Sequence, residues 1–345
     1  MLAGAGGASN RTADSDNVTG WMVDRDMQDR QEGVARQLAD DLWVIDTLFQ
    51  GEPGTIASYL LTGDNGLALI DVGSGATVEQ LLAGVRAAGF DPTDIRHLVL
   101  THIHLDHAGA SGALVRRIPE AQVYVHRLGA PHLAHPEKLL SSAQRIYGDK
   151  MDRLWGTTEP VPEDHLHVVE DGQRITVGSR TLLALYTPGH AIHHLAYFDE
   201  QRGELFAGDV AGVQLEGSDY VRPPTPPPDL NLEDWYASID RIEALHPSVL
   251  YLPHFGRVGD VEVHLEQLRR RLGDWGALML ANIRQGKTDT ELAAILARTF
   301  DPDVAQSIPG DETAVERYEL VANYLMSAQG YVRYYRKVHP ELLAS

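Results

Sequence analysis

The stretch Thr-His-Ile-His-Leu-Asp-His at residues 101–107 places three imidazoles and one carboxylate within six positions. The apolar run 97–100 before it predicts a short buried strand, and the small residues 108–115 after it are compatible with a helix. The stretch therefore stands at the carboxyl end of a strand, where open α/β sheets bind their ligands. Such nitrogen and oxygen donors suit zinc, iron or manganese better than calcium or magnesium. We interpret it as a metal site rather than a surface histidine cluster, because the segments on both sides are predicted to form a buried strand and a helix.

A dinuclear site needs further donors, and three later strand patterns end in residues that qualify. The apolar residues 182–186 run into the turn Thr187-Pro188-Gly189-His190. The segment 204–209 ends in Asp209, and the segment 248–254 ends in His254. We expect these three side chains to complete the metal site begun by residues 102–107.

These motifs and their order resemble the metallo-β-lactamase superfamily of hydrolases. The match rests on His102, His104, Asp106 and His107, the turn 187–190, the pair Gly208-Asp209, His254, and the segment 68–73 that contains Asp71. It covers about residues 40 to 260. The segments 123–148 and 223–228 are more specifically similar to a poorly characterised prokaryotic branch, which says little about substrate. The implied fold is α/β, an αββα sandwich of the metallo-β-lactamase type with a C-terminal helical extension.

The resemblance implies a ligand set of seven residues. One metal would be held by His102, His104 and His190, and a second by Asp106, His107 and His254, with Asp209 bridging them. Asp71 is expected to orient the histidine loop by hydrogen bonds, and His194 to support the site without binding metal. The neighbouring His193 is not expected to be a ligand. We expect two divalent metal ions, zinc before iron or manganese.

The reaction implied is hydrolysis by a hydroxide held between the two metals, whose pKa falls towards about 7. We expect a small ester-like substrate, with a lactone slightly ahead of a thioester of the glyoxalase II kind. The alternatives are a phosphodiesterase and a persulfide dioxygenase that uses one iron. Asp106 is a candidate proton carrier. Gly212 stands where lactonases of the superfamily carry a tyrosine, so Tyr220 or Arg222 is the candidate for the missing donor.

Composition and charge restrict the classes of partner that we expect the protein to bind. The chain has 29 basic and 49 acidic residues and a formal charge of −20, which disfavours nucleic acid, because phosphates are bound by Lys and Arg. It has no cysteine, and we find no run of 18 apolar residues and no secretory signal. We expect a cytoplasmic enzyme with a small-molecule substrate, no membrane partner, and a homodimer as an open alternative.

Along the chain we expect a disordered N-terminus at residues 1–20, a catalytic domain at 21–260 and a helical extension at 261–345. Within the catalytic domain, helices are predicted at 78–88 and 232–245. The insert 129–155 is either a substrate-pocket wall or a helical pair packed on the body, and the prolines of 223–228 are candidates for another wall.

In the extension, helices are predicted at 261–284 and 313–337, with a capping box at 288–291. The apolar stripe of the last helix is interpreted as core or dimer interface, with a substrate role as an alternative. Its members are Tyr318, Val321, Tyr324, Leu325, Val332 and Tyr335.

Overall fold

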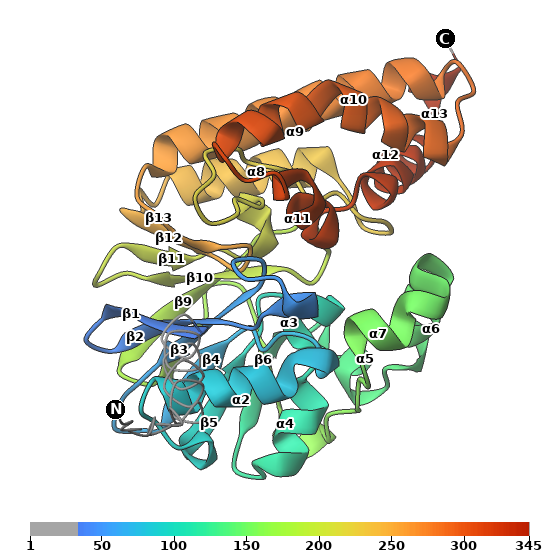
Figure 1. Cartoon of the computed structure of the whole chain (residues 1–345). Coiled ribbons are helices and arrows are strands. Elements are labelled where there is room, and N and C mark those ends of the chain that lie inside the picture. The colour runs from blue at the N-terminus through green and yellow to red at the C-terminus, as the bar shows by residue number, and fades with distance from the viewer. Residues whose placement is uncertain (1–33, 345) are drawn as a thin grey trace, which may run out of the picture.

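The computed structural model describes residues 34–344, so the prediction for residues 1–20 lies outside the described part of the chain. Two sheets face each other, with helices on both outer sides (Figure 1). The first sheet has seven strands in chain order, antiparallel from β1 to β4 and parallel from β4 to β7. They are β1 (Ala35–Ala39), β2 (Leu42–Asp46), β3 (Ala57–Leu61), β4 (Leu67–Ile70), β5 (Ile95–Val99), β6 (Gln122–His126) and β7 (Leu166–Val169).

The second sheet has six strands in the order β13-β12-β11-β10-β9-β8, and β11 pairs with β12 in parallel. They are β8 (Arg174–Val177), β9 (Arg180–Tyr186), β10 (Leu195–Asp199), β11 (Glu204–Phe206), β12 (Val249–Leu252) and β13 (Gly256–Val258). The inner faces of the two sheets share one apolar core, in which the rings of Tyr59 and Phe206 lie 5.6 Å apart. The Tyr59 hydroxyl donates to the Leu252 carbonyl at 2.6 Å, which ties β3 to the end of β12.

Helices cover the outer faces because each buries an apolar stripe. Helix α2 (Val78–Ala87) buries Val78, Leu81, Leu82 and Val85, at the spacing of one helical face, and packs with α4 (Ser111–Arg117) on the first sheet. Helix α8 (Leu232–Glu243), capped by Asn231, packs on the second sheet. The α/β sandwich expected from the sequence is confirmed.

The C-terminal helices continue the outer layer on the second sheet (Figure 1). They are α9 (Val261–Ile283), α10 (Asp289–Ser307), α11 (Ala314–Val321), α12 (Tyr324–Val338) and α13 (Pro340–Leu343). The capping box between Thr288 and Glu291 forms as predicted. The single helix predicted at 313–337 is wrong. Ala322 leaves the helical region, and the Asn323 side chain accepts hydrogen bonds from the backbone amides of Leu325 and Met326, so a new helix starts there.

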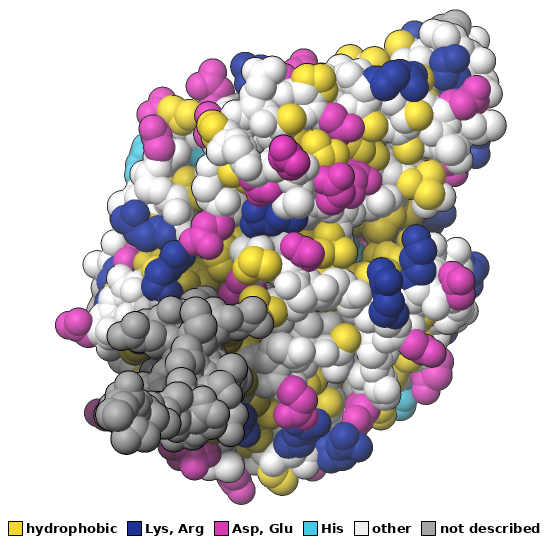
Figure 2. Space-filling model, viewed as in Figure 1, with side chains coloured by type: hydrophobic (Ala, Val, Ile, Leu, Met, Phe, Trp, Pro, Cys, Tyr) yellow, Lys and Arg dark blue, Asp and Glu magenta, His cyan; other side chains and the backbone are white. Residues whose placement is uncertain are grey.

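Most of the apolar stripe in this region is core. Tyr318, Tyr324, Val332 and Tyr335 are buried together with residues of β11, β12 and α8, so the extension shares one core with the second sheet. The division of the chain at residue 260 stays a prediction. No helix within residues 34–344 has the length and apolar character needed to span a membrane. On the face seen in Figure 2, acidic and basic side chains are interspersed over the surface.

The insert between β6 and β7 is helical, with α5 (Ala130–Ala134), α6 (Glu137–Tyr147) and α7 (Met151–Trp155). Trp155 stacks on Phe49 with ring centroids 5.3 Å apart, and both belong to a small cluster that also contains Leu105. The insert is therefore anchored to the body beside α3 (Leu105–Ala108), the short helix that follows the histidine stretch. Helix α6 projects towards α11 and α12 without joining their core (Figure 1).

Candidate metal centre

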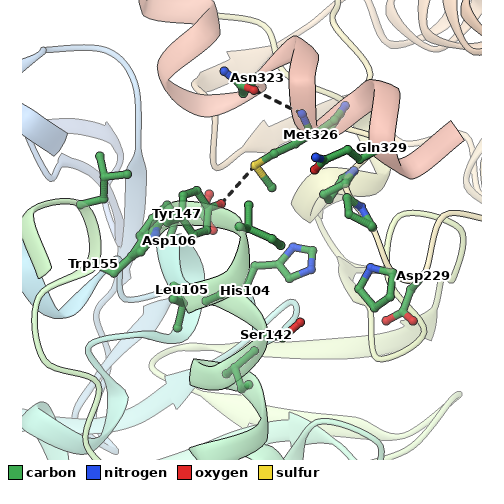
Figure 3. Close-up of a pocket in the computed structure, with 18 of the residues that line it drawn as sticks. His104, Leu105, Asp106, Ser142, Tyr147, Trp155, Asp229, Asn323, Met326 and Gln329 are labelled. Carbon is green, nitrogen blue, oxygen red and sulfur yellow. Dashed lines mark hydrogen bonds between the residues drawn. The ribbon is translucent and has the colours of Figure 1, made fainter. Parts of the chain in front are cut away.

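A cavity of about 880 Å³ lies between the insert and the C-terminal helices (Figure 3). Its floor includes His104, Asp106, His190 and Asp209, and residues 224–228 of the proline segment form one side. Leu139 and Trp155 of the insert face residues of α11 and α12 such as Val321 and Met326. The insert thus both packs on the body and lines the cavity, and the proline segment is a wall as the sequence suggested.

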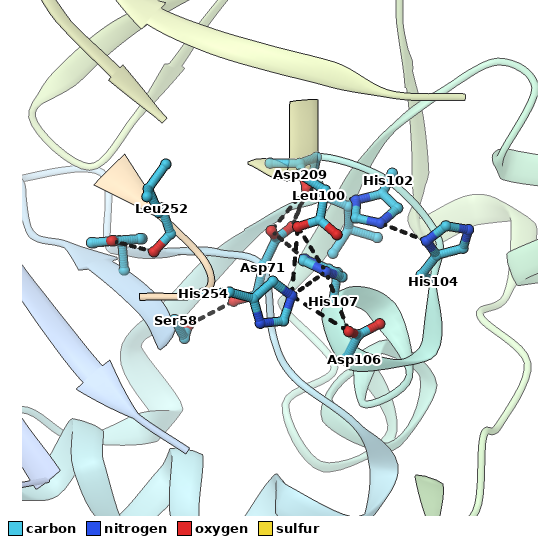
Figure 4. A network of polar contacts seen from close by, with 12 residues as sticks. Ser58, Asp71, Leu100, His102, His104, Asp106, His107, Asp209, Leu252 and His254 are labelled. Carbon is cyan, nitrogen blue, oxygen red and sulfur yellow. Dashed lines mark hydrogen bonds and ion pairs between the residues drawn. The ribbon is translucent and has the colours of Figure 1, made fainter. Parts of the chain in front are cut away.

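All seven predicted donors converge at one edge of the sandwich, where four of them line the cavity. Figure 4 shows six of the seven, His102, His104, Asp106, His107, Asp209 and His254. His102 and His104 follow β5, and Asp106 and His107 lie on α3. The other three follow later strands: His190 after β9, Asp209 in the short 3₁₀ helix Gly208–Ala211 after β11, and His254 after β12.

Three imidazoles form the first group of donors. The Nδ1 atom of His104 lies 2.9 Å from Nε2 of His102 and 2.9 Å from Nε2 of His190. His190 Nδ1 is 2.8 Å from the Pro224 carbonyl and donates to it, so its Nε2 carries a lone pair directed at the other two rings. Lone pairs gathered in this way are stabilised by a shared cation.

The second group combines a carboxylate with two imidazoles. Asp106 Oδ2 lies 3.6 Å from His107 Nε2 and 3.5 Å from His254 Nε2, and the two ring nitrogens are 3.2 Å apart. His254 Nδ1 donates to the Thr55 carbonyl at 3.0 Å, and His107 Nδ1 lies 2.9 Å from Asp71 Oδ2. These outer hydrogen bonds hold the Nε2 atoms towards the centre.

Asp209 lies between the two groups. Its Oδ2 is 3.5 Å from His190 Nε2 in the first group, and its Oδ1 is 3.4 Å from His107 Nε2 and 3.5 Å from His254 Nε2 in the second. Oδ1 is buried and has no hydrogen-bond partner within the described residues. A buried carboxylate oxygen without a partner is costly, and cations held by the two groups of donors would remove that cost. The residues therefore fit two metal ions, whose identity the donor set leaves open.

Asp71 organises the loop that carries the first donors. Besides facing His107, its carboxylate accepts hydrogen bonds from the Thr101 amide at 2.8 Å and from the Thr101 hydroxyl at 2.8 Å. The backbone of Asp71 has φ +52°, a conformation that non-glycine residues rarely adopt. Its position at the end of β4 gives it the orienting role expected from the sequence.

Electrostatics keep most donors in the form that binds metal. Burial and the neighbouring imidazoles lower the pKa of His102 well below its usual value, and burial and His190 lower the pKa of His104 to about 3. Burial raises the pKa of Asp106, but the charges of His107 and His254 outweigh it and bring the pKa to about 2. His102, His104 and His190 are therefore neutral, and Asp106 and Asp209 are ionised, at neutral pH. Burial lowers the pKa of His107 and of His254, but the neighbouring carboxylates outweigh it and raise both pKa values, so these two rings would have to lose a proton when they bind a cation.

His194 and His193 lie beside the ligands. His194 accepts a hydrogen bond from the Val210 amide at 3.4 Å and its Nδ1 lies 2.9 Å from the Thr187 hydroxyl, so it links the turn before His190 to the turn that carries Asp209. His193 lines the cavity, where its Nδ1 accepts from the Ile103 amide at 3.4 Å. Neither belongs to a cluster of possible metal donors among the described residues.

Gly208 provides a first test of this packing. A Cβ atom there would lie 2.4 Å from His194 Nε2, and its φ of +58° disfavours any side chain. We expect Gly208→Ala to displace Asp209 and to weaken metal binding by about 10- to 100-fold, as for other substitutions beside ligands. Metal titration of the purified variant measures this. Gly286→Ala is the control, because φ is +74° but no atom lies within 4 Å of its Cβ. Equal metal affinity in both variants would contradict the proposed packing.

The structure does not bring Tyr220 or Arg222 into the cavity lining, so neither is positioned as the missing donor. Tyr220 is buried against Tyr318, and the Arg271 guanidinium lies 3.7 Å from its ring centroid. Arg222 is fully buried and bonded to Glu319 and Tyr324. The sequence interpretation is wrong here because the segment after residue 212 turns into the core shared with the C-terminal helices.

Tyr147 at the end of α6 is the tyrosine that sequence reasoning missed. It lines the cavity beside Asp106 (Figure 3), and its hydroxyl donates to Met326 Sδ at 3.3 Å. Burial and the Asp106 charge raise its pKa, so it stays protonated at neutral pH. Only its aromatic character within a helical insert was visible in the sequence, and that pattern is equally typical of core.

Comparison with known proteins agrees with this geometry. A family model described as the metallo-beta-lactamase superfamily matches residues 51–254, a range that contains all seven donors. The crystal structure of TTHA1429 from Thermus thermophilus superposes with a TM-score of 0.59 and 26% identity, covering 82% of this chain and 88% of that protein. ST1585 from Sulfurisphaera tokodaii is 29% identical over 221 residues, 63% of this chain and 79% of that protein. Both names give a fold and no substrate.

An atrochrysone carboxyl ACP thioesterase from Aspergillus fumigatus is 27% identical over 242 residues. The alignment covers 69% of this chain but only 46% of that enzyme.

Proposed function

The chain belongs to the metallo-beta-lactamase superfamily, and we propose that it is a dinuclear metal-dependent hydrolase acting on a lactone or thioester. The observation that carries the proposal is the position of Asp209, with one oxygen towards each group of donors. A single metal ion would be bound by only one of the two groups of donors, and the other group would have no cation to bind. The cavity directly above the donors gives a substrate access to both groups of donors.

Two bound cations would supply Lewis acidity, which brings the pKa of a water towards about 7 and polarises a carbonyl. The protein's own side chains supply the rest. Asp106 keeps 16% of its side chain exposed to the cavity, so it is placed to take a proton from the attacking water and pass it to the leaving group. Tyr147 is placed to donate to an oxygen that gains charge, because a thioether sulfur is a weak acceptor that a substrate oxygen outcompetes.

Substitution of Tyr147 tests that last role. We expect Tyr147→Phe to lower kcat by about a hundredfold on an active substrate, the cost of removing one donor to a developing oxyanion. Steady-state kinetics give kcat and KM separately. Tyr334→Phe is the control, because the Tyr334 hydroxyl bonds to Glu233 and does not line the cavity. An unchanged kcat in Tyr147→Phe would assign Tyr147 to packing alone.

Metal content tests the proposal as a whole. Elemental analysis of protein expressed without added metal should find about two metal ions per chain, and the loaded protein should hydrolyse at least one member of a panel of lactones and thioesters. Bis(p-nitrophenyl) phosphate in the same panel separates a phosphodiesterase. One iron per chain, with oxygen consumed in the presence of a persulfide, would overturn hydrolysis in favour of a dioxygenase.

A further inference from the structure

The cavity above the metal centre has apolar walls. Leu139, Ile146 and Trp155 lie on the insert side, and Val321, Leu325 and Met326 lie on the side of α11 and α12. Leu325 is 40% exposed, although it is a large apolar residue on a helix that otherwise packs on the core. The cavity between these two apolar walls is far larger than a single metal-bound water, and its apolar lining suits a hydrocarbon chain.

Four cations stand on the insert side of the same cavity. They are Lys138 and Arg145 on α6, Lys150 in the turn after it, and Arg153 on α7, and all four line the cavity and are exposed. Lys138 and Arg145 are seven residues apart, so they lie on one face of α6, and Leu139 and Ile146, each one position later, lie about 100° further round the helix. Figure 2 shows dark-blue side chains beside a hollowed yellow surface where Figure 1 places α6 and α7.

These cations have no carboxylate partner within residues 34–344. Some arginines elsewhere on the surface do, such as Arg174, which pairs with Glu200 at 2.8 Å, and Arg269, which pairs with Asp240 at 2.6 Å. In a chain with a formal charge of −20, these four cations concentrate positive charge at one cavity. Grouped cations that lack internal partners raise the local concentration of anionic ligands.

The negative charges of the cavity lie elsewhere. Asp106 and Asp209 belong to the metal centre, and Glu319 pairs with Arg222 at 2.8 Å. Asp229 lies near His190 on the proline side, where burial raises its pKa. The cavity is therefore polarised, with cations on the insert and anions at the floor and the opposite wall.

We propose that the cavity selects substrates in which an apolar acyl chain is joined through a thioester to a phosphate- or carboxylate-bearing thiol. The inference rests on the proposed hydrolase function and adds the substrate class. The acyl chain lies between the apolar walls, the carbonyl lies over the metal centre, and the anionic end reaches the insert cations. Water adds its oxygen to the carbonyl carbon, the carbon–sulfur bond breaks, and the thiol takes one proton of the water while the acid releases the other. This choice places a charged thioester ahead of the neutral lactone that the sequence slightly favoured.

Three thioesters of decanoic acid test the class with the metal-loaded full chain. Coenzyme A carries phosphates, glutathione carries carboxylates, and N-acetylcysteamine is neutral, so the arms also separate the two anionic groups. We expect kcat/KM for at least one charged thioester to exceed that for the neutral one by about tenfold or more at low salt. The ratio should fall as salt is added, because exposed charges are screened over about 8–10 Å.

Neutral replacements of the cations give the decisive comparison. The variant Lys138→Gln/Arg145→Gln/Lys150→Gln/Arg153→Gln should lose at least about tenfold in the charged-to-neutral ratio of kcat/KM. Its side chains are exposed, so folding should be little affected. The control is Arg86→Gln/Arg298→Gln, two exposed arginines outside the cavity lining, which should keep the wild-type ratio. A wild-type ratio near one, or a ratio unchanged in the fourfold variant, would overturn the inference.

Binding separates this inference from the proposed function. S-decyl-coenzyme A, S-decyl-glutathione and S-decyl-N-acetylcysteamine are thioethers that cannot be hydrolysed, and calorimetry gives their Kd values. A charged thioether that binds about tenfold more tightly than the neutral one, with no hydrolysis of any thioester, supports the substrate class and overturns the proposed reaction. Hydrolysis of all three thioesters, with equal Kd values for the three thioethers, would support the proposed reaction and overturn the substrate class.

Discussion

Asp209→Asn should lose at least one of the two metal ions and nearly all hydrolysis. The carboxylate faces His190 with one oxygen and His107 and His254 with the other. An amide of the same shape has only one oxygen, and its NH₂ group cannot bind a cation. Since substitutions merely beside a metal ligand cost about 10- to 100-fold, we expect more than about a hundredfold loss in kcat. Elemental analysis and steady-state kinetics on the same preparation measure both effects.

A carboxylate outside the centre provides the control for Asp209→Asn. Asp240 lies on α8, is exposed and pairs with Arg269, so Asp240→Asn should keep the metal content and kcat of the wild type. Two metals and full activity in Asp209→Asn would show that Asp209 does not bridge. A single retained metal would identify which donor group is the tighter one, once combined with His190→Ala and His254→Ala.

Arg222→Met should destabilise the protein by about 3 kcal/mol, the lower end of the range for breaking a buried ion pair, because Glu319 keeps partial exposure. Arg222 is fully buried, donates to Glu319 Oε1 at 2.8 Å and to the Tyr324 hydroxyl at 2.8 Å, and lies 4.1 Å from the Tyr324 ring centroid. It therefore joins the loop after β11 to α11 and α12. Urea unfolding of the metal-free protein measures the change.

The stability lost in Arg222→Met should increase as pH rises. This direction is opposite to that expected for a carboxylate whose pKa is lowered on folding. Burial raises the pKa of Glu319 even though Arg222 lowers it, and removal of Arg222 should raise it further. A carboxyl whose pKa is raised on folding binds protons more tightly in the folded state, so stability falls as pH rises through that range. The deficit of Arg222→Met should therefore be larger at about pH 8 than at about pH 5.

Two further variants separate the ion pair from packing. Arg222→Met/Glu319→Gln should regain part of the stability lost in Arg222→Met, because no uncompensated charge remains buried. Arg298→Met, on the exposed face of α10, should change stability by less than about 0.5 kcal/mol. If the single and double variants were equally unstable, lost packing rather than charge would be the cause.

The cavity depends on two segments that are distant in sequence. The insert is anchored beside α3 through Phe49 and Trp155, and α11 and α12 are anchored to the second sheet through Tyr318 and Tyr324. The Tyr147 hydroxyl and Met326 Sδ meet across the gap at 3.3 Å (Figure 3). Because thioether sulfur is a weak acceptor, this contact can open without a large cost. A substrate that separates the two walls is therefore compatible with the fold.

The seven candidate donors were predictable from sequence because they follow apolar strand patterns, either directly or, for Asp106 and His107, on the short helix α3 after β5. The strands before these donors, β5 in the first sheet and β9, β11 and β12 in the second, end at the same edge of the sandwich, so His107 and His254 meet although they are 147 positions apart in the chain. Asp71, which directly follows β4, was singled out by the family resemblance. The α/β sandwich and the capping box at Thr288 follow from local periodicity and local hydrogen bonding, whereas the αββα arrangement was implied by the family resemblance.

Other features of the site and fold could not be predicted from local sequence patterns, because they depend on contacts between residues that are distant in the chain. Tyr220 and Arg222 follow Asp209 closely in sequence, yet burial in the C-terminal core removes them from the cavity, while Tyr147 enters from the insert. The break at Asn323 also lies inside an uninterrupted helical pattern. The sequence by itself determined the fold class and the candidate metal donors, because strand periodicity and strand ends are local. Only the tertiary structure decided which side chains face the substrate, because long-range packing of the insert against the C-terminal helices shapes the cavity.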